Sequence, residues 1–271
     1  MGRAFVNGIT VGYDDRGEGA PLVLIHGHPF DRSMWAPQLT EFAGAGLRVI
    51  APDLRGYGES TVVPGKTSLD TFARDIAALL DHLGLDQVVI GGLSMGGQIV
   101  MEFCRLFPGR VRGLLLADTF AQAETGEGRE LRGRQADRLL REGMRPYADE
   151  VLAKMVAPYN IEALPEVAEH VLGMMRAAPP EGAAAALRGR AERPDYGDLL
   201  PRITVPALVV VGRDDEYTPV ADAEFMHRRI PGATLVVVDG AAHLPNLERP
   251  AEFNRALHAL LAAGLRAPAP G

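Results

Sequence analysis

The sequence predicts an α/β protein whose central sheet is mostly parallel and is covered by helices on both faces. Short apolar runs rich in β-branched residues are bounded by turn residues, and helical segments separate them. Apolarity within each run is continuous, which is typical of strands buried on both faces. Alternation of strands with helices is typical of a parallel sheet. The predicted strands are residues 21–25, 48–51, 87–90, 111–117, 207–211 and 234–238.

The segments between these strands carry helical periodicity. Residues 68–83 begin with Ser68, a good N-cap, and place their leucines, Phe72 and Ile76 on one face. Residues 96–107 and 251–262 have similar patterns. These segments are therefore expected to be the helices that cover the sheet.

Residues 120–196 interrupt this alternation, because they have helical patterns and no strand. The sequence predicts a core of residues 1–119 and 197–271 and a helical cap of residues 120–196. Methionine adapts its shape to a ligand, so we expect an apolar pocket under this cap. The methionines on which this expectation rests are Met144, Met155, Met174 and Met175.

Composition excludes several classes of function. The net charge is -7, which argues against a nucleic-acid or anionic membrane surface. One cysteine, Cys104, allows no internal disulfide, and no apolar stretch reaches the ~18 residues of a membrane span. The N-terminus has no signal-peptide pattern. We therefore expect a cytoplasmic protein, of an oligomeric state that the sequence leaves open.

The strongest chemical signal is Gly92-Leu93-Ser94-Met95-Gly96, which follows a predicted strand and opens a predicted helix. This is the context of a G-x-S-x-G nucleophile elbow. The glycines are needed because so tight a turn leaves no room for side chains. We expect Ser94 to be a nucleophile, with the start of the helix favouring an oxyanion nearby.

A serine hydroxyl needs an adjacent base. His243 follows the last predicted strand, so it lies on a loop at the carboxyl edge of the sheet with Ser94. His26 and His28 are alternatives, although His26 is better explained as a structural turn residue. The other histidines fall on helical patterns and are expected at the surface; they are His82, His170, His227 and His258.

The base needs a carboxylate that fixes its tautomer. Asp215 follows the strand 207–211, and the chain order Ser, Asp, His is that of hydrolases with an elbow. Asp118 and Asp214 stay as alternatives, with Asp118 placed beside the cap, where it could line the pocket entrance. Asp215 ranks first.

An oxyanion hole needs two backbone N–H groups. One is expected from Met95, which follows the nucleophile, and the other from His28 in the loop after strand 21–25. The His28 side chain is then either a second polar group facing the substrate or a group facing solvent.

These segments together resemble the α/β-hydrolase superfamily over nearly the whole chain. Residues 26–35 resemble its H-G-x-P…W segment, residues 53–60 its structural D-x-R-G-x-G-x-S segment, and residues 240–248 its histidine loop, with Ala242 where glycine is commoner. Residues 212–219 resemble its acid loop, in which the carboxylate stands three residues before threonine, and this favours Asp215. Residues 116–119 and 186–194 resemble 3-oxoadipate enol-lactonase-like esterases.

The resemblance implies a serine hydrolase that cleaves a small carboxylic ester or lactone through a Ser94–His243–Asp215 triad. No metal or other cofactor is expected, because the sequence has no H-E-x-x-H motif and no cysteine cluster. Two alternatives stay open. One is a cofactor-free perhydrolase of the haloperoxidase type, or a lyase, on the same triad. The other is a non-catalytic small-molecule receptor.

Overall fold

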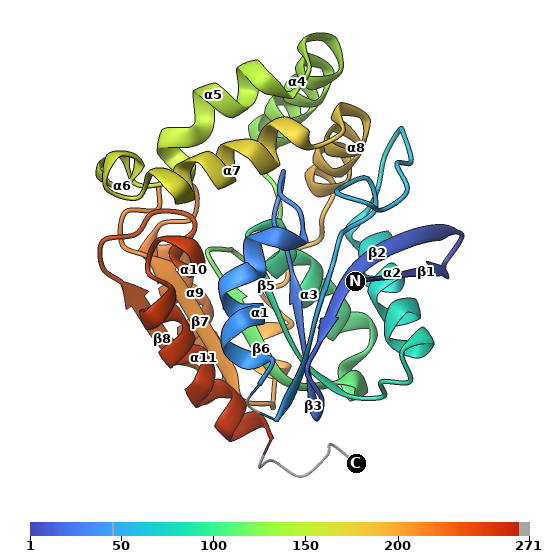
Figure 1. Cartoon of the computed structure of the whole chain (residues 1–271), viewed down its shortest axis with the longest axis vertical. Helices are drawn as coiled ribbons and strands as arrows, with labels where there is room; N and C mark the ends of the chain where they lie inside the picture. The colour runs from blue at the N-terminus through green and yellow to red at the C-terminus, as the bar shows by residue number, and fades with distance from the viewer. Residues whose placement is uncertain (45, 266–271) are drawn as a thin grey trace.

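An eight-stranded sheet runs through the molecule in the order β1-β2-β4-β3-β5-β6-β7-β8 (Figure 1). The computed structural model describes residues 1–44 and 46–265. The pairs from β4 to β8 are parallel, whereas β1 and β2 pair antiparallel with each other and β2 with β4. The strands are β1 Gly2–Val6, β2 Ile9–Arg16, β3 Ala20–Ile25, β4 Leu47–Pro52, β5 Val88–Leu93, β6 Val111–Ala117, β7 Ala207–Gly212 and β8 Thr234–Val238.

All six predicted strands form, and the predicted fold class is confirmed. Sequence analysis missed β1 and β2, which form a hairpin at one edge of the sheet. This hairpin mixes buried and exposed residues, so it lacks the continuous apolarity of the central strands. Its turn, Asn7-Gly8, has positive φ at both residues, as a two-residue hairpin turn requires. That dipeptide was the signal that could have identified it.

Helices cover both faces of the sheet, as the complete burial of β5 and β7 requires. Ser68 caps α2 as predicted, because its side chain accepts the Thr71 N–H at 3.1 Å. The helices of this layer are α1 Ala36–Phe42, α2 Leu69–His82, α3 Met95–Leu106, α9 Val220–Arg229, α10 Pro245–Glu248 and α11 Pro250–Gly264. Short 3₁₀ turns are η1 Arg32–Trp35, η2 Pro108–Arg110 and η3 Leu200–Arg202.

Five further helices lie between β6 and β7 in the chain and sit over the carboxyl ends of the strands (Figure 1). They are α4 Gly126–Glu142, α5 Met144–Met155, α6 Pro158–Ala163, α7 Pro165–Ala177 and α8 Pro180–Ala191. The Thr67 N–H donates to the Ala185 carbonyl at 3.0 Å, so α8 is fixed to a loop of the sheet layer. The division into core and cap at residues 120–196 stays a prediction, and residues 266–271 of that core lie outside the described residues.

None of the helices in the described part of the chain combines the length and apolar character that a membrane crossing requires.

Candidate active site

Ser94 stands on the turn between β5 and α3 with φ of 56°, a left-handed conformation that is uncommon for a residue with a side chain. The turn depends on glycine at two positions. A Cβ on Gly92 would lie 2.3 Å from the carbonyl carbon of Gly96, and one on Gly96 would lie 2.2 Å from the Ile25 carbonyl oxygen. The local sequence therefore holds Ser94 clear of the end of the sheet.

His243 and Asp215 are paired. The Nδ1 atom of His243 lies 2.7 Å from Oδ2 of Asp215, and both side chains are buried. The Asp215 carboxylate also accepts the Tyr217 N–H at 2.8 Å and the Thr218 hydroxyl. Although burial raises the pKa of Asp215, His243 and these donors lower it below its ordinary value. The carboxylate is thus ionised and holds the imidazole by Nδ1, which leaves Nε2 for another partner.

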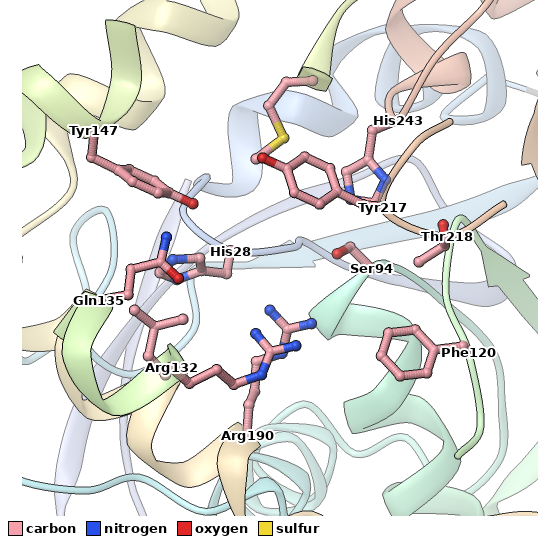
Figure 2. A pocket seen from close by; sticks show the side chains of 12 residues that line it. His28, Ser94, Phe120, Arg132, Gln135, Tyr147, Arg190, Tyr217, Thr218 and His243 are labelled. Atoms are coloured by element: carbon pink, nitrogen blue, oxygen red, sulfur yellow. The ribbon is translucent and has the colours of Figure 1, made fainter. Parts of the chain in front are cut away.

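Ser94 and His243 face one cavity of about 110 Å³ (Figure 2). This cavity is smaller than the 300–1,000 Å³ typical of drug-sized ligand pockets, so it suits a small molecule. It lies between the carboxyl ends of the strands and the α4–α8 helices. The lining residues are His28, Ser94, Phe120, Arg132, Gln135, Tyr147, Met155, Leu187, Arg190, Tyr217, Thr218 and His243.

Neither alternative aspartate is hydrogen-bonded to His243 among the described residues. Asp214 accepts a hydrogen bond from the Tyr159 hydroxyl, away from His243. Asp118 was placed near the pocket entrance, and this was wrong, because its side chain is fully buried and does not line the cavity. Asp118 follows β6, which pairs with β7, and its Oδ1 accepts the N–H of Gly212 at the end of β7 at 2.8 Å.

Asp118, Asp215 and His243 each bring one potential metal-ligating atom within 4.8 Å of the others. Two of these residues are already hydrogen-bonded to each other, because Asp215 Oδ2 lies 2.7 Å from His243 Nδ1. Burial and then the charge of Asp215 raise the pKa of Asp118 well above its ordinary value. The raised pKa favours the neutral carboxylic acid form of Asp118, which makes the cluster a poor cation site.

Met95 and His28, whose amides are predicted to form an oxyanion hole, belong to two segments that adjoin the Ser94 turn. Met95 is the first residue of α3, and first-turn N–H groups have no intrahelical acceptor. The His28 amide follows Gly27, which packs against the elbow: a Cβ on Gly27 would lie 2.9 Å from the Leu93 carbonyl oxygen. Both amides therefore belong to segments next to Ser94.

The His28 side chain faces the cavity rather than solvent. Burial, and then the charges of Arg190 and Arg132, lower its pKa well below the ordinary value. Its Nδ1 lies 2.7 Å from the hydroxyl of Tyr57, which burial keeps protonated by raising its pKa. If that hydroxyl donates to Nδ1, the neutral ring carries its proton on Nε2. In the described chain this buried Nε2 has no partner.

The other histidines take structural positions. His26 accepts the Leu54 N–H at 2.9 Å through Nε2, which supports its interpretation as a turn residue. His82 and His258 are exposed as predicted, whereas His227 and His170 are half-buried rather than surface groups, His170 beside Ser33.

The expectation of an apolar pocket was wrong. Of the four methionines only Met155 lines the cavity, while the other three are buried among the α4–α8 helices. The polar lining residues that sequence analysis missed include Arg132 and Arg190 (Figure 2). A signal existed in α8: Arg190 continues the i, i+3, i+4, i+7 stripe of the buried residues Ala183, Ala186 and Leu187.

Comparisons with known proteins identify the family of the chain. The family described as "alpha/beta hydrolase fold" matches residues 20–250. 3-Oxoadipate enol-lactonase 2 of Acinetobacter baylyi is 33% identical over 94% of this chain and 92% of its own length. A putative non-heme chloroperoxidase of Synechocystis is 30% identical over 88% of this chain and 90% of its own. A malate-bound thermophilic esterase of Thermogutta terrifontis is 41% identical with a TM-score of 0.94, covering 97% of this chain and 99% of its own. The chain belongs to the α/β-hydrolase family.

Proposed function

We propose that this protein is a serine hydrolase that cleaves a small carboxylic ester or lactone through an acyl-enzyme. Ser94 is the nucleophile, His243 the base and Asp215 the carboxylate that orients it. One observation carries the proposal. His243 is bound at Nδ1 by Asp215 at 2.7 Å and lines the same small cavity as Ser94 (Figure 2).

In the first half of the reaction, His243 Nε2 takes the proton of Ser94 Oγ while Oγ attacks the ester carbonyl carbon. The carbonyl oxygen becomes an oxyanion, which accepts hydrogen bonds from the Met95 and His28 amides. His243 then gives its proton to the leaving alkoxide as the C–O bond breaks. In a lactone, the alkoxide stays attached to the acyl group.

In the second half, water replaces the serine hydroxyl. His243 takes a proton from this water, whose oxygen attacks the acyl carbon, and then returns it to Ser94 Oγ as the carboxylic acid leaves. Asp215 stays ionised throughout and stabilises the imidazolium form of His243. The pKa of Asp215, lowered by His243, fits this role.

The relatives support an ester or lactone as the substrate. The Acinetobacter relative is named an enol-lactonase and the Thermogutta protein an esterase, and both match nearly the whole chain. A cavity of about 110 Å³ favours a short acyl chain and a small alcohol.

A cofactor-free perhydrolase is the second candidate, favoured by the relative named a putative non-heme chloroperoxidase. Such a reaction would use the same acyl-enzyme, with hydrogen peroxide replacing water as the second nucleophile. The alternatives of a lyase and of a non-catalytic receptor have no such support.

A panel of short p-nitrophenyl esters and lactones, with and without hydrogen peroxide and bromide, tests both candidates. We expect hydrolysis without peroxide and one phosphonate adduct per chain with a fluorophosphonate probe. Bromination with peroxide at rates above hydrolysis would favour the perhydrolase. If neither turnover nor an adduct were observed, the protein would instead be a non-catalytic small-molecule receptor.

A further inference from the structure

A buried positive charge without a carboxylate partner lies in the active-site cavity. Arg190 of α8 has 7% of its surface exposed and lines the cavity with Ser94. Its Nε donates to the side-chain oxygen of Gln98, a neutral acceptor, at 3.0 Å. No carboxylate among the described residues comes within ion-pair distance of Arg190. Burying an arginine in this way is costly unless something else accepts its hydrogen bonds.

The neighbouring charges add to this excess. Arg132 and Arg193 both bind Glu124, which is therefore shared between two cations. Although burial raises the pKa of Glu124, hydrogen bonds from Arg193 and Arg132 lower it to about 2. Three guanidinium groups thus have one carboxylate among the described ion pairs. Burial and then the charges of Arg132 and Arg193 lower the pKa of Arg190, which still stays protonated, since arginine does not lose its proton in proteins.

A second cavity, which we call the outer cavity, shows the opposite pattern; it is lined by Leu131, Arg134, Gln135, Arg138, Glu150, Val151, Lys154 and Tyr217. It has a volume of about 360 Å³ and shares Gln135 and Tyr217 with the inner one. Among its cations, Arg138 pairs with Glu142 and Glu150, and Lys154 lies 3.8 Å from Glu216. In the outer cavity, the positive charges of Arg138 and Lys154 are therefore paired with carboxylates of the protein. The uncompensated charge belongs to the inner cavity, where the substrate would react.

The guanidinium groups of Arg190 and Arg132 both project into the cavity on the side of Ser94 opposite His243 (Figure 2). The bond from Arg190 Nε to Gln98 leaves the two terminal nitrogens of Arg190 without a partner in the described chain. Guanidinium groups bind carboxylates with two parallel hydrogen bonds. This arrangement has the chemistry of a carboxylate receptor that the protein itself does not fill.

We propose that Arg190, assisted by Arg132, binds a carboxylate carried by the substrate. The inference rests on the proposed function and narrows it to short esters or lactones with a second, ionised carboxyl group a few bonds from the scissile carbonyl. A cavity of about 110 Å³ suits a carboxylate on a short chain better than a bulkier phosphate. The unpartnered His28 Nε2 is a further polar contact for such a substrate.

The test compares esters that differ only in charge. Monomethyl succinate and monomethyl glutarate are paired with methyl 4-methylpentanoate and methyl 5-methylhexanoate, in which an isopropyl group replaces the carboxylate. Methanol release gives kcat/KM for each. The wild-type protein is expected to prefer the anionic member by at least ~10-fold, and Arg190→Gln to lower that ratio by about 10-fold or more, because it removes one partner of a buried charge pair.

Two control variants accompany Arg190→Gln. One changes another arginine of α8, and the other replaces Arg190 with a different cation. Arg188→Gln removes a cation that pairs with Asp137 outside the cavity and should leave the ratio unchanged. Arg190→Lys keeps the charge and should recover part of the preference. If Arg190→Gln does not fold, Arg132→Gln is measured instead, and it should also lower the ratio.

Binding is measured separately by titrating Ser94→Ala protein with monomethyl succinate, with and without Arg190→Gln. Loss of binding with Arg190→Gln supports the proposal even if turnover is absent. Equal or better hydrolysis of the neutral esters by the wild type would overturn it and leave the esterase intact. The proposal would also be overturned if Arg190→Gln changed neither the anionic-to-neutral ratio of kcat/KM nor the affinity for monomethyl succinate.

Discussion

A carboxyl oxygen of Asp118 lies within 4.8 Å of one of Asp215, and both side chains are buried. Two ionised carboxylates at this distance repel each other strongly in a dry site. The pair avoids this by separating its pKa values. Burial and then the charge of Asp215 raise the pKa of Asp118. Although burial also raises the pKa of Asp215, His243 and the other hydrogen-bond donors lower it below its ordinary value. These opposite shifts favour a protonated Asp118 beside an ionised Asp215.

The first prediction follows from this difference. Asp215→Asn should lower kcat by up to ~10⁴, because it removes the charge that stabilises the His243 imidazolium and favours the wrong tautomer. Asp118→Asn should cost about tenfold or less, since the raised pKa of Asp118 favours its neutral acid form, which an amide matches in shape and charge. Steady-state kinetics on both variants, with matched thermal unfolding, makes the comparison. If Asp118→Asn lost activity while Asp215→Asn stayed active, the carboxylate that orients His243 would be Asp118, which follows β6.

The second prediction concerns stability. An acid whose pKa is raised in the folded state reduces stability as pH rises from its unfolded pKa, about 3.9, toward the folded value, because the unfolded chain releases the proton first. The amide introduced by Asp118→Asn does not titrate, so this variant should have a higher Tm than the wild type near pH 7 and a similar Tm near pH 4. Thermal unfolding of both proteins from pH 4 to 8 measures the difference. A difference in Tm that does not grow with pH would mean that Asp118 is ionised in the folded protein.

The third prediction concerns His28. Because burial and two arginines lower its pKa well below the ordinary value, the ring stays neutral in the range where activity is measured. His28→Gln should reduce kcat/KM by removing a donor at Nε2, without moving the midpoint of the pH–activity curve. Tyr57→Phe is the matched variant, since it removes only the partner of Nδ1. A shifted midpoint in His28→Gln would instead identify His28 as a titrating base.

The fourth prediction concerns the nucleophile. Ser94→Ala should abolish labelling by a fluorophosphonate and lower kcat by about a million-fold, the loss typical of a missing triad nucleophile. Intact-mass spectrometry reports the adduct, and His243→Ala is expected to label slowly while retaining Ser94. An adduct of the same mass on Ser94→Ala protein would point to another residue.

Residues at strand ends could be predicted from the sequence. Asp215 and His243 each follow a strand of continuous apolarity, and parallel strands bring their carboxyl ends to one edge. That argument needs only the order of elements, so it places both near Ser94 before any packing is known. It could not decide the position of Asp118, because the side-chain direction after β6 depends on its positive φ of 43°.

By itself, the sequence determined the fold class, the elbow and the residues at the carboxyl edge, because apolar runs, glycines and chain order encode them locally. Tertiary structure alone decided the chemistry of the cavity. Arg132 and Arg190 lie on different helices, α4 and α8, and they reach one cavity only because those helices pack together over the sheet. Periodicity identifies a buried stripe on α8, but it does not reveal whether Arg190 meets a carboxylate or an open cavity. That depends on contacts between residues far apart in the chain.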